Sequence, residues 1–206
     1  MNSSVPKQFL MLNHRPILMH TITKMHNAIP QAEIIVALPK EYQKQWQELC
    51  AQKLYKVPHQ CVNGGENRFQ SVKNALEHIS SPSLVVIHDG VRPFVSEKVV
   101  NQCLLDAHKN GASIPVIKME DSLRKINNQD SEIVERKHYV RVQTPQCFKS
   151  DIIIKAYQQE YQISFTDDAS VVESINHKIS LCEGNKENIK ITTPEDLVLA
   201  EHLLSI

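Results

Sequence analysis

Short runs of apolar, β-branched residues alternate along the chain with longer stretches in which apolar residues recur every three or four positions. The runs Glu33–Leu38, Leu84–His88 and Ser113–Ile117 are continuous rather than alternating in polarity, which is typical of strands buried on both faces. Strands that alternate with helices predict an α/β, Rossmann-like fold with a mostly parallel twisted sheet and helices on both faces.

Three stretches carry helix signals. Arg68–Ile79 and Glu97–Asn110 each place their apolar residues on one helical face. The second is preceded by Ser96, a good N-cap, and followed by Gly111, a common C-terminal stop. Thr193-Pro194-Glu195-Asp196 combines a capping threonine, a proline in the first turn and acidic residues at the positive end of the dipole. It therefore predicts a third helix that runs to the end of the chain.

One stretch departs from this alternation of predicted strands and helices. Residues Lys118–Gln143 are polar and charged, with too little apolar content for a core helix. Residues 127–130 (Asn-Asn-Gln-Asp) read as a turn between two extended arms. We interpret residues 118–143 as a β-arm that projects from a single domain, 1–206, and is used in dimerisation.

Composition narrows the class of protein. The 206 residues include 23 basic and 23 acidic side chains, so no global field attracts nucleic acid or a membrane. No apolar run is long enough to span a bilayer, and the first residues do not resemble a signal peptide. The five cysteines are scattered and odd in number, which favours reduced thiols and a cytoplasmic protein. The dispersed histidines make a zinc site unexpected.

The clearest candidate for chemistry is His88-Asp89-Gly90-Val91-Arg92-Pro93, directly after an apolar run. Ligands in open α/β sheets bind beyond the carboxyl ends of strands. There, Asp89 can hold magnesium and Arg92 can reach a phosphate. The alternative is a turn in which the two side chains only pair with each other.

Other polar motifs have ordinary structural alternatives. Gly64-Gly65-Glu66-Asn67-Arg68 with Ser71 places glycines before a helix, where backbone amides can approach a ligand, or it is a plain capped turn. The remaining motifs are Pro6-Lys7-Gln8, Thr144-Pro145-Gln146, Thr166-Asp167-Asp168-Ala169-Ser170 and Asn188-Ile189-Lys190-Ile191-Thr192. By themselves they read as a surface lysine, two capping arrangements and a short edge strand. One magnesium-type carboxylate with scattered cations and no evident nucleophile favours phosphoryl-type chemistry.

Taken together and in this order, these motifs resemble those of the 2-C-methyl-D-erythritol 4-phosphate cytidylyltransferase family over nearly the whole chain. The resemblance implies a reaction of CTP with 2-C-methyl-D-erythritol 4-phosphate that gives a CDP-alcohol and pyrophosphate, requires Mg²⁺, and belongs to non-mevalonate isoprenoid synthesis. It also implies a homodimer in which the arm of one subunit crosses to the other.

The resemblance assigns roles by position. Lys7 and Lys190 would contact the CTP phosphates, and Asp89 would hold magnesium. Gly65, Glu66 and Ser71 would recognise the cytidine. Thr144 would line the site, and the remaining residues, Arg92, Ser122, Arg136 and Thr166, would bind the sugar-alcohol phosphate.

This sequence departs from the family pattern at three places. Ser122 stands where the family has threonine, and Glu66 where aspartate is common. The family begins with a strand and a glycine-rich loop, roughly AAGxGxRM, and Met1 stands where that loop ends. We therefore expect the chain as written to lack part of the triphosphate site and to have little activity. Two alternatives stay open: a ribitol 5-phosphate cytidylyltransferase, and a truncated, non-catalytic nucleotide-binding paralogue.

Overall fold

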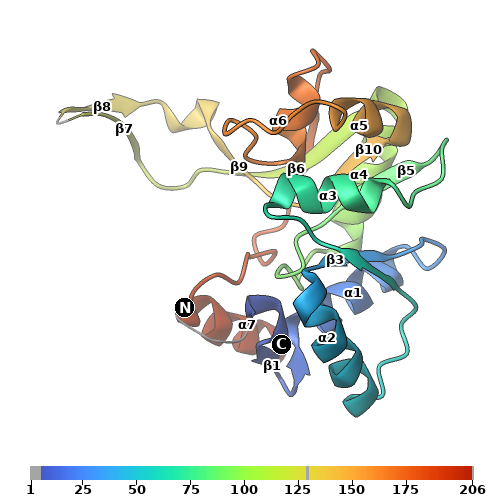
Figure 1. Ribbon diagram of the computed structural model, residues 1–206. Coiled ribbons are helices and arrows are strands. Elements are labelled where there is room, and N and C mark those ends of the chain that lie inside the picture. Colours follow the sequence, from blue (N-terminus) through green and yellow to red (C-terminus); the bar gives the residue numbers. More distant parts are fainter. Residues whose placement is uncertain (1–5, 129, 206) are drawn as a thin grey trace.

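Two groups of strands form the frame of the molecule in a computed structural model that describes residues 6–128 and 130–205 (Figure 1). The strands are β3 (Ile35–Leu38), β4 (Gln60–Asn63), β5 (Leu84–Ile87), β6 (Ala112–Lys118), β9 (Val140–Val142), β10 (Gln146–Lys149) and β11 (Ser180–Glu183). Five of them form a sheet in the order β11-β6-β10-β5, with β9 also paired to β6, and β3 pairs with β4. The expectation that the glycine-rich loop of the family ends at Met1 concerns residues 1–5, which lie outside the described residues.

The α/β, Rossmann-like architecture is confirmed, but the central sheet is mixed. Strand β11 runs parallel to β6, and β3 parallel to β4, whereas β10 is antiparallel to both β5 and β6. The cause is the connection between β6 and β10. No helix lies between these strands in the described part of the chain except a short 3₁₀ turn; the chain leaves β6, forms the arm and returns beside β6 as β9, so it re-enters the sheet in the opposite direction.

The three helices expected from sequence are present as α3 (Arg68–Leu76), α4 (Glu97–Asn110) and α7 (Pro194–Ser205). Helix α4 has the expected ends: Ser96 Oγ accepts the N–H of Val99 at 3.2 Å, and Gly111 has a positive φ of 95°. The pattern did not identify α1 (Ile17–Ala28), α2 (Lys40–Gln52), α5 (Ser150–Ala156) or α6 (Asp168–Glu173).

Helices cover both faces of the five-stranded sheet, as expected. Phe148 of β10 is fully buried in a cluster with residues of α3, α5 and α6, including Phe69 and Ile153. The preceding residue, Cys147, packs with Cys103 and Ala107 of α4. Because successive side chains of a strand point to opposite faces, α4 lies on one face and the other three helices on the opposite face.

A second core surrounds Trp46 of α2. It joins α1, β3 and the short 3₁₀-helix η1 (Lys7–Phe9). The rings of Phe9 and Trp46 stack with their centroids 5.7 Å apart, and Trp46 Nε1 donates to His59 Nε2 at 2.9 Å. Burial of Phe9 therefore anchors the segment that carries Lys7.

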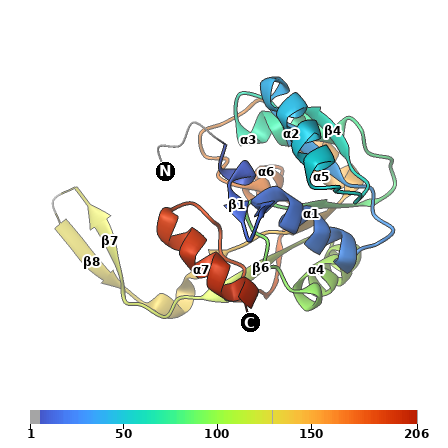
Figure 2. The ribbon, with the colours of Figure 1, turned by 90° about the horizontal axis from the view of Figure 1, so that it is seen from below.

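The polar stretch forms a hairpin that projects away from the rest of the molecule in both views (Figures 1 and 2). Its strands are β7 (Leu123–Asn127) and β8 (Asp130–Val134), paired antiparallel. Gln129, which the sequence places in the turn, lies outside the described residues. A short antiparallel pair, β1 (Met11–Leu12) with β2 (Arg15–Pro16), precedes α1, and a second 3₁₀-helix, η2 (Arg136–His138), follows β8.

The short strand expected at residues 188–192 is absent: this segment is irregular in the structure. Ile191 is buried, and its N–H donates to the carbonyl of Val91 at 3.0 Å. This single backbone hydrogen bond, to the turn that contains Val91, takes the place of the strand pairing that the sequence predicts. Within residues 6–128 and 130–205, none of the helices has the length and hydropathy needed to cross a membrane.

Candidate active site

Three cationic side chains converge on the carboxylate of Asp89, directly after β5. Lys190 Nζ lies 3.0 Å and Arg92 Nε 3.1 Å from its Oδ2, and Arg68 Nε lies 3.6 Å from its Oδ1. The cations come from the segment after β11, the turn after β5 and the start of α3. The Asp89 side chain is 11% exposed and that of Lys190 45%, so the cluster opens to solvent on the lysine side.

These neighbours determine the charge of Asp89. Burial by itself would raise its pKa, but the charges of Lys190 and Arg68, with a further contribution from Arg92, outweigh burial and lower the pKa to about 2. The carboxylate is therefore ionised at neutral pH. An ionised oxygen donor among cations is a suitable surrounding for a metal ion bound together with a polyphosphate.

The residues present fit magnesium bound together with a nucleotide. Within residues 6–128 and 130–205, no group of three or more His, Cys, Asp or Glu side chains could hold a metal by itself. Magnesium usually uses one or two carboxylates, with substrate phosphates and water supplying the other ligands. Asp89 can be that carboxylate, and its role as a metal ligand stays a prediction.

Arg68 is part of the glycine motif, but the sequence analysis assigned it no role. Its guanidinium binds both carboxylate oxygens of Asp168, at 2.9 and 2.5 Å, while its Nε faces Asp89. Asp168 is fully buried and also accepts the hydroxyl of Tyr157 at 2.6 Å. This network fixes the direction of Arg68. No sequence signal separates the buried Asp168 from its neighbour Asp167, because burial is decided by the packing of α6.

The glycine motif forms a tight turn before α3. The N–H of Gly65 donates to Ser71 Oγ at 3.0 Å, and the same hydroxyl donates to the carbonyl of Asn67 at 2.9 Å. A Cβ at Gly65 would lie 2.4 Å from Cβ of Gln70, so the position requires glycine for space. Glu66 is exposed. The three residues expected to bind the cytidine therefore lie together, and their contact with nucleotide stays a prediction.

The remaining expected residues of the domain lie at different distances from this cluster. Thr144 is buried and its Oγ1 accepts the N–H of Asp89 at 3.0 Å, so it belongs to the cluster. Thr166 is exposed, just before Asp167, the N-cap of α6. Lys7 is exposed at the start of η1. No ion pair or side-chain hydrogen bond joins Lys7 to another residue in the described part of the chain.

The two expected residues of the arm lie outside the cluster. Ser122 precedes β7 and Arg136 begins η2; both are exposed. Arg136 donates to the carbonyl of Glu120, also on the arm. The hairpin extends away from the body of the same chain (Figure 1). In the described part of the chain, no hydrogen bond or ion pair joins either residue to the cluster around Asp89.

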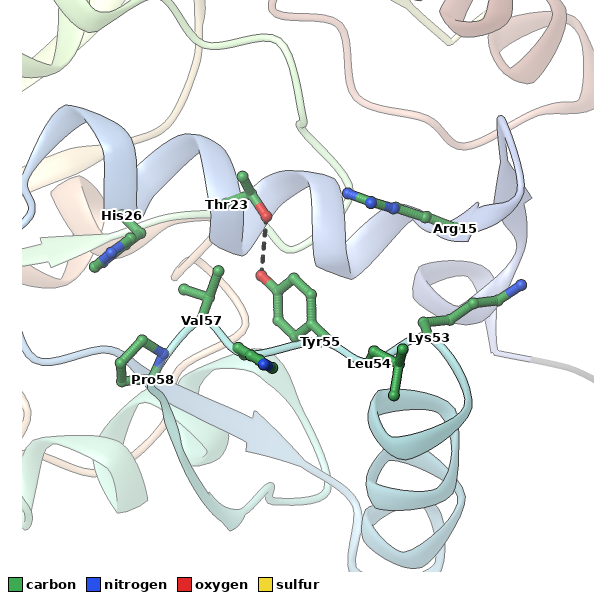
Figure 3. Close-up of a pocket in the computed structure, with 9 residues that line it drawn as sticks. Arg15, Thr23, His26, Lys53, Leu54, Tyr55, Val57 and Pro58 are labelled. Atoms are coloured by element: carbon green, nitrogen blue, oxygen red, sulfur yellow. Dashed lines mark hydrogen bonds between the residues drawn. The ribbon is translucent and has the colours of Figure 1, made fainter.

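A groove of about 370 Å³ lies elsewhere, between α1 and residues 53–58 (Figure 3). Arg15, His26, Lys53 and Lys56 are among its lining residues. The hydroxyl of Tyr55 contacts Thr23 at 3.0 Å and donates to the carbonyl of Met19 at 3.1 Å, so it ties this segment to α1. The groove contains none of the site residues expected from sequence.

Comparisons with known proteins agree with the resemblance seen in the motifs. The family model described as 2-C-methyl-D-erythritol 4-phosphate cytidylyltransferase matches residues 1–205. Curated proteins of that name from Bacteroides fragilis and Bacteroides thetaiotaomicron are 47% and 46% identical over 204 residues. In both cases the match covers 99% of this chain and 93% of the relative.

Solved structures give the same result. A 2-C-methyl-D-erythritol 4-phosphate cytidylyltransferase from Thermus thermophilus superposes with a TM-score of 0.83 at 33% identity, covering 98% of this chain and 94% of that one. A 4-diphosphocytidyl-2C-methyl-D-erythritol synthase from Anaerococcus prevotii superposes with a TM-score of 0.86 at 27% identity, covering 100% and 92%.

Proposed function

Because this chain belongs to the 2-C-methyl-D-erythritol 4-phosphate cytidylyltransferase family, we propose that the cluster around Asp89 is where it transfers CMP from CTP to 2-C-methyl-D-erythritol 4-phosphate. The convergence of Lys190, Arg92 and Arg68 on one ionised carboxylate carries this assignment. The cluster combines a metal-type oxygen donor with cations that can pair with phosphate oxygens.

The reaction is a displacement at the α-phosphorus of CTP. An oxygen of the acceptor phosphate forms the new P–O bond, the bond to pyrophosphate breaks, and the product is a CDP-alcohol in isoprenoid biosynthesis. Such chemistry depends on positioning and on neutralisation of negative charge. Lys190, beside Asp89, and Lys7, on the exposed η1, pair with the phosphates and with the charge that develops during transfer.

Magnesium is the proposed cofactor, and Asp89 its protein ligand. When bound, the ion neutralises phosphate charge and helps to align the triphosphate. The ionised carboxylate of Asp89 is consistent with this role, because a carboxylate binds a metal in its deprotonated form.

The proposed cytidine subsite is the turn before α3. Gly65 brings backbone close to the ligand, Ser71 holds the turn through its two hydrogen bonds, and the exposed Glu66 reads the base. The acceptor phosphate binds beside this subsite, at Arg92 and Thr166, and Thr144 lines the site through its contacts with Asp89 and His88. Arg92 is suited to it because a planar guanidinium can bind two oxygens at once.

Ser122 and Arg136 complete the acceptor subsite from the partner of a homodimer. The exposed apolar residues of the arm support this proposal. Ile126 and Ile133 lie on the hairpin and are 76% and 78% exposed, so together they give the arm an apolar surface that a partner chain can cover. A cytoplasmic location is also proposed, and it is supported by five free cysteines, as expected in a reducing compartment.

Replacement of Asp89 tests the assignment. We expect Asp89→Asn to lower pyrophosphate release from CTP and 2-C-methyl-D-erythritol 4-phosphate by about 10²–10³-fold, because a preorganised charge is lost. Asp151→Asn, an exposed aspartate at the start of α5, is the control and keeps the wild-type rate. Wild-type turnover in Asp89→Asn would contradict the assignment. A higher rate with ribitol 5-phosphate as acceptor would instead support the related activity.

A further inference from the structure

The turn after β5 carries both Asp89 and Arg92. Its closing backbone bond runs from the N–H of Arg92 to the carbonyl of Asp89, at 3.1 Å. Its two middle residues are held from outside, because Thr21 Oγ1 donates to the carbonyl of Gly90 and the N–H of Ile191 donates to the carbonyl of Val91, both at 3.0 Å. The two ends of the turn, which carry the charged side chains, depend on other contacts. The residue directly before the turn, His88, contacts both of its ends.

His88 reaches one end directly and the other through a hydroxyl. Its Nε2 lies 2.9 Å from the carbonyl oxygen of Arg92. Its Nδ1 lies 2.9 Å from Thr144 Oγ1, and that oxygen also accepts the backbone N–H of Asp89 at 3.0 Å. The chain of contacts therefore runs from Asp89 through Thr144 and His88 to Arg92.

The chemistry of these groups sets the direction of each bond. A carbonyl oxygen only accepts, so the proton of His88 is on Nε2. The Thr144 oxygen accepts the N–H of Asp89, and its own proton is donated to Nδ1. These directions hold for a neutral ring, in which the single proton on Nε2 leaves Nδ1 as an acceptor.

The same contacts extend toward Lys190. The fully buried Asn188 donates its Nδ2 to the carbonyl of Thr144 at 2.8 Å, and its own backbone carbonyl accepts Nη1 of Arg92 at 2.8 Å. Thr144 and Arg92 therefore also locate the segment that carries Lys190. One connected network holds three of the four charged groups of the cluster.

We propose that His88 is a positioning residue for CMP transfer: by bonding Arg92 directly and Asp89 through Thr144, it holds the two charged side chains in their working geometry. The inference rests on the proposed function and extends it. His88 does not act as a general base, because both ring nitrogens are engaged within the protein. Its contribution is preorganisation, where a displacement of about 1 Å can cost about 10²-fold in rate.

Two substitutions separate the two ends of the network. His88→Gln keeps a donor near the position of Nε2 for the carbonyl of Arg92 and loses the partner of Thr144. His88→Asn keeps an acceptor near Nδ1 for Thr144 and loses the bond to Arg92. Thr144→Val removes the hydroxyl, and Thr144→Ser restores it. His108→Gln on the exposed side of α4 is the matched control.

The measurements are kcat, KM for CTP, calorimetric binding of Mg²⁺–CTP, melting temperature, and the ¹⁵N spectrum of the His88 ring. We expect kcat to fall about 10²-fold in His88→Gln and in Thr144→Val, with most of the rate regained in Thr144→Ser. The double variant should be no slower than the worse single one, because the two residues act as one unit. The spectrum should show a neutral ring protonated at Nε2, and His108→Gln should match the wild type.

Three results would overturn the proposal: melting temperatures that fall while kcat stays at the wild-type value, rate losses of the two residues that multiply, or a proton on Nδ1. Failure of the proposed function is a separate result, namely no CMP transfer by the wild-type protein. In that case the ring spectrum and the binding of Mg²⁺–CTP still test the role of His88, because His88→Gln must weaken that binding if His88 positions Asp89 and Arg92.

Discussion

At Asp89, three cations from separate parts of the chain meet one carboxylate, and the balance of burial against charge decides its state. Burial disfavours the ionised form, but Lys190 and Arg68 reverse that preference, so the pKa lies at about 2 rather than at its ordinary 3.8. A lowered pKa means that folding favours the ionised carboxylate. The stabilisation is present above about pH 4 and is lost as the pH falls through the folded value.

The lowered pKa of Asp89 leads to a prediction on the stability of the protein. In metal-free buffer, wild type should exceed Asp89→Asn in free energy of unfolding by about 2 kcal/mol near neutral pH, since each pKa unit corresponds to about 1.4 kcal/mol. The difference should shrink between about pH 4 and about pH 2, the ordinary and the folded pKa. Urea unfolding of both proteins over this range measures it, and two curves that stay parallel throughout would contradict the assignment of the low pKa to Asp89.

At the scale of elements, α3 and α6 are joined by a pair that neither helix pattern reveals. Asp167 and Ser170 form a capping box at the start of α6, so the interpretation of residues 166–170 as a capping arrangement is confirmed. The next residue, Asp168, instead reaches Arg68 at the start of α3. The two helix starts are therefore held together beside Asp89.

Breaking this pair should lower stability more than loss of an ordinary surface contact. We expect Asp168→Asn to reduce the free energy of unfolding by about 3 kcal/mol, because it leaves the guanidinium of Arg68 without its buried counter-charge. Glu173→Gln, exposed on the same helix, should change it by less than about 0.5 kcal/mol. Denaturant unfolding measures both, and equal losses would show that the buried pair contributes nothing particular.

At the scale of the whole molecule, the arm separates the two expected halves of the acceptor subsite. Arg92 and Thr166 lie within the domain, whereas Ser122 and Arg136 lie on the projecting segment. In the proposed homodimer a partner chain brings them together, and the exposed apolar side chains of Ile126 and Ile133 would lie at the interface.

Mixing variants tests this arrangement. Arg136→Ala and Lys190→Ala should each be nearly inactive. An equal mixture should regain up to about a quarter of wild-type activity, because random exchange makes about half of the dimers hybrids and each hybrid has one intact site of two. Size-exclusion chromatography should show a dimer that Ile126→Glu with Ile133→Glu weakens. Subunit exchange without recovery of activity would exclude a shared site.

The sequence by itself determined the local features of this protein. The continuous apolar runs identified β3, β5 and β6, and capping residues identified the ends of α4, because these signals depend on neighbours within a few positions. Short α5 and α6 were missed, since one or two turns give too little periodicity to detect. Motif order pointed to the family, and Asp89 was recognised from its place after a strand.

Only the tertiary structure decided what depends on residues distant in the sequence. The antiparallel direction of β10 follows from the excursion of the arm, and Arg68 gained its role when α6 buried Asp168 beside it. The contacts of His88 arise in the same way, because Thr144 lies 56 positions away and its hydroxyl meets the ring only in the folded sheet. Hydrogen-bond partners and burial depend on contacts between distant parts of the chain, so no local sequence pattern encodes them.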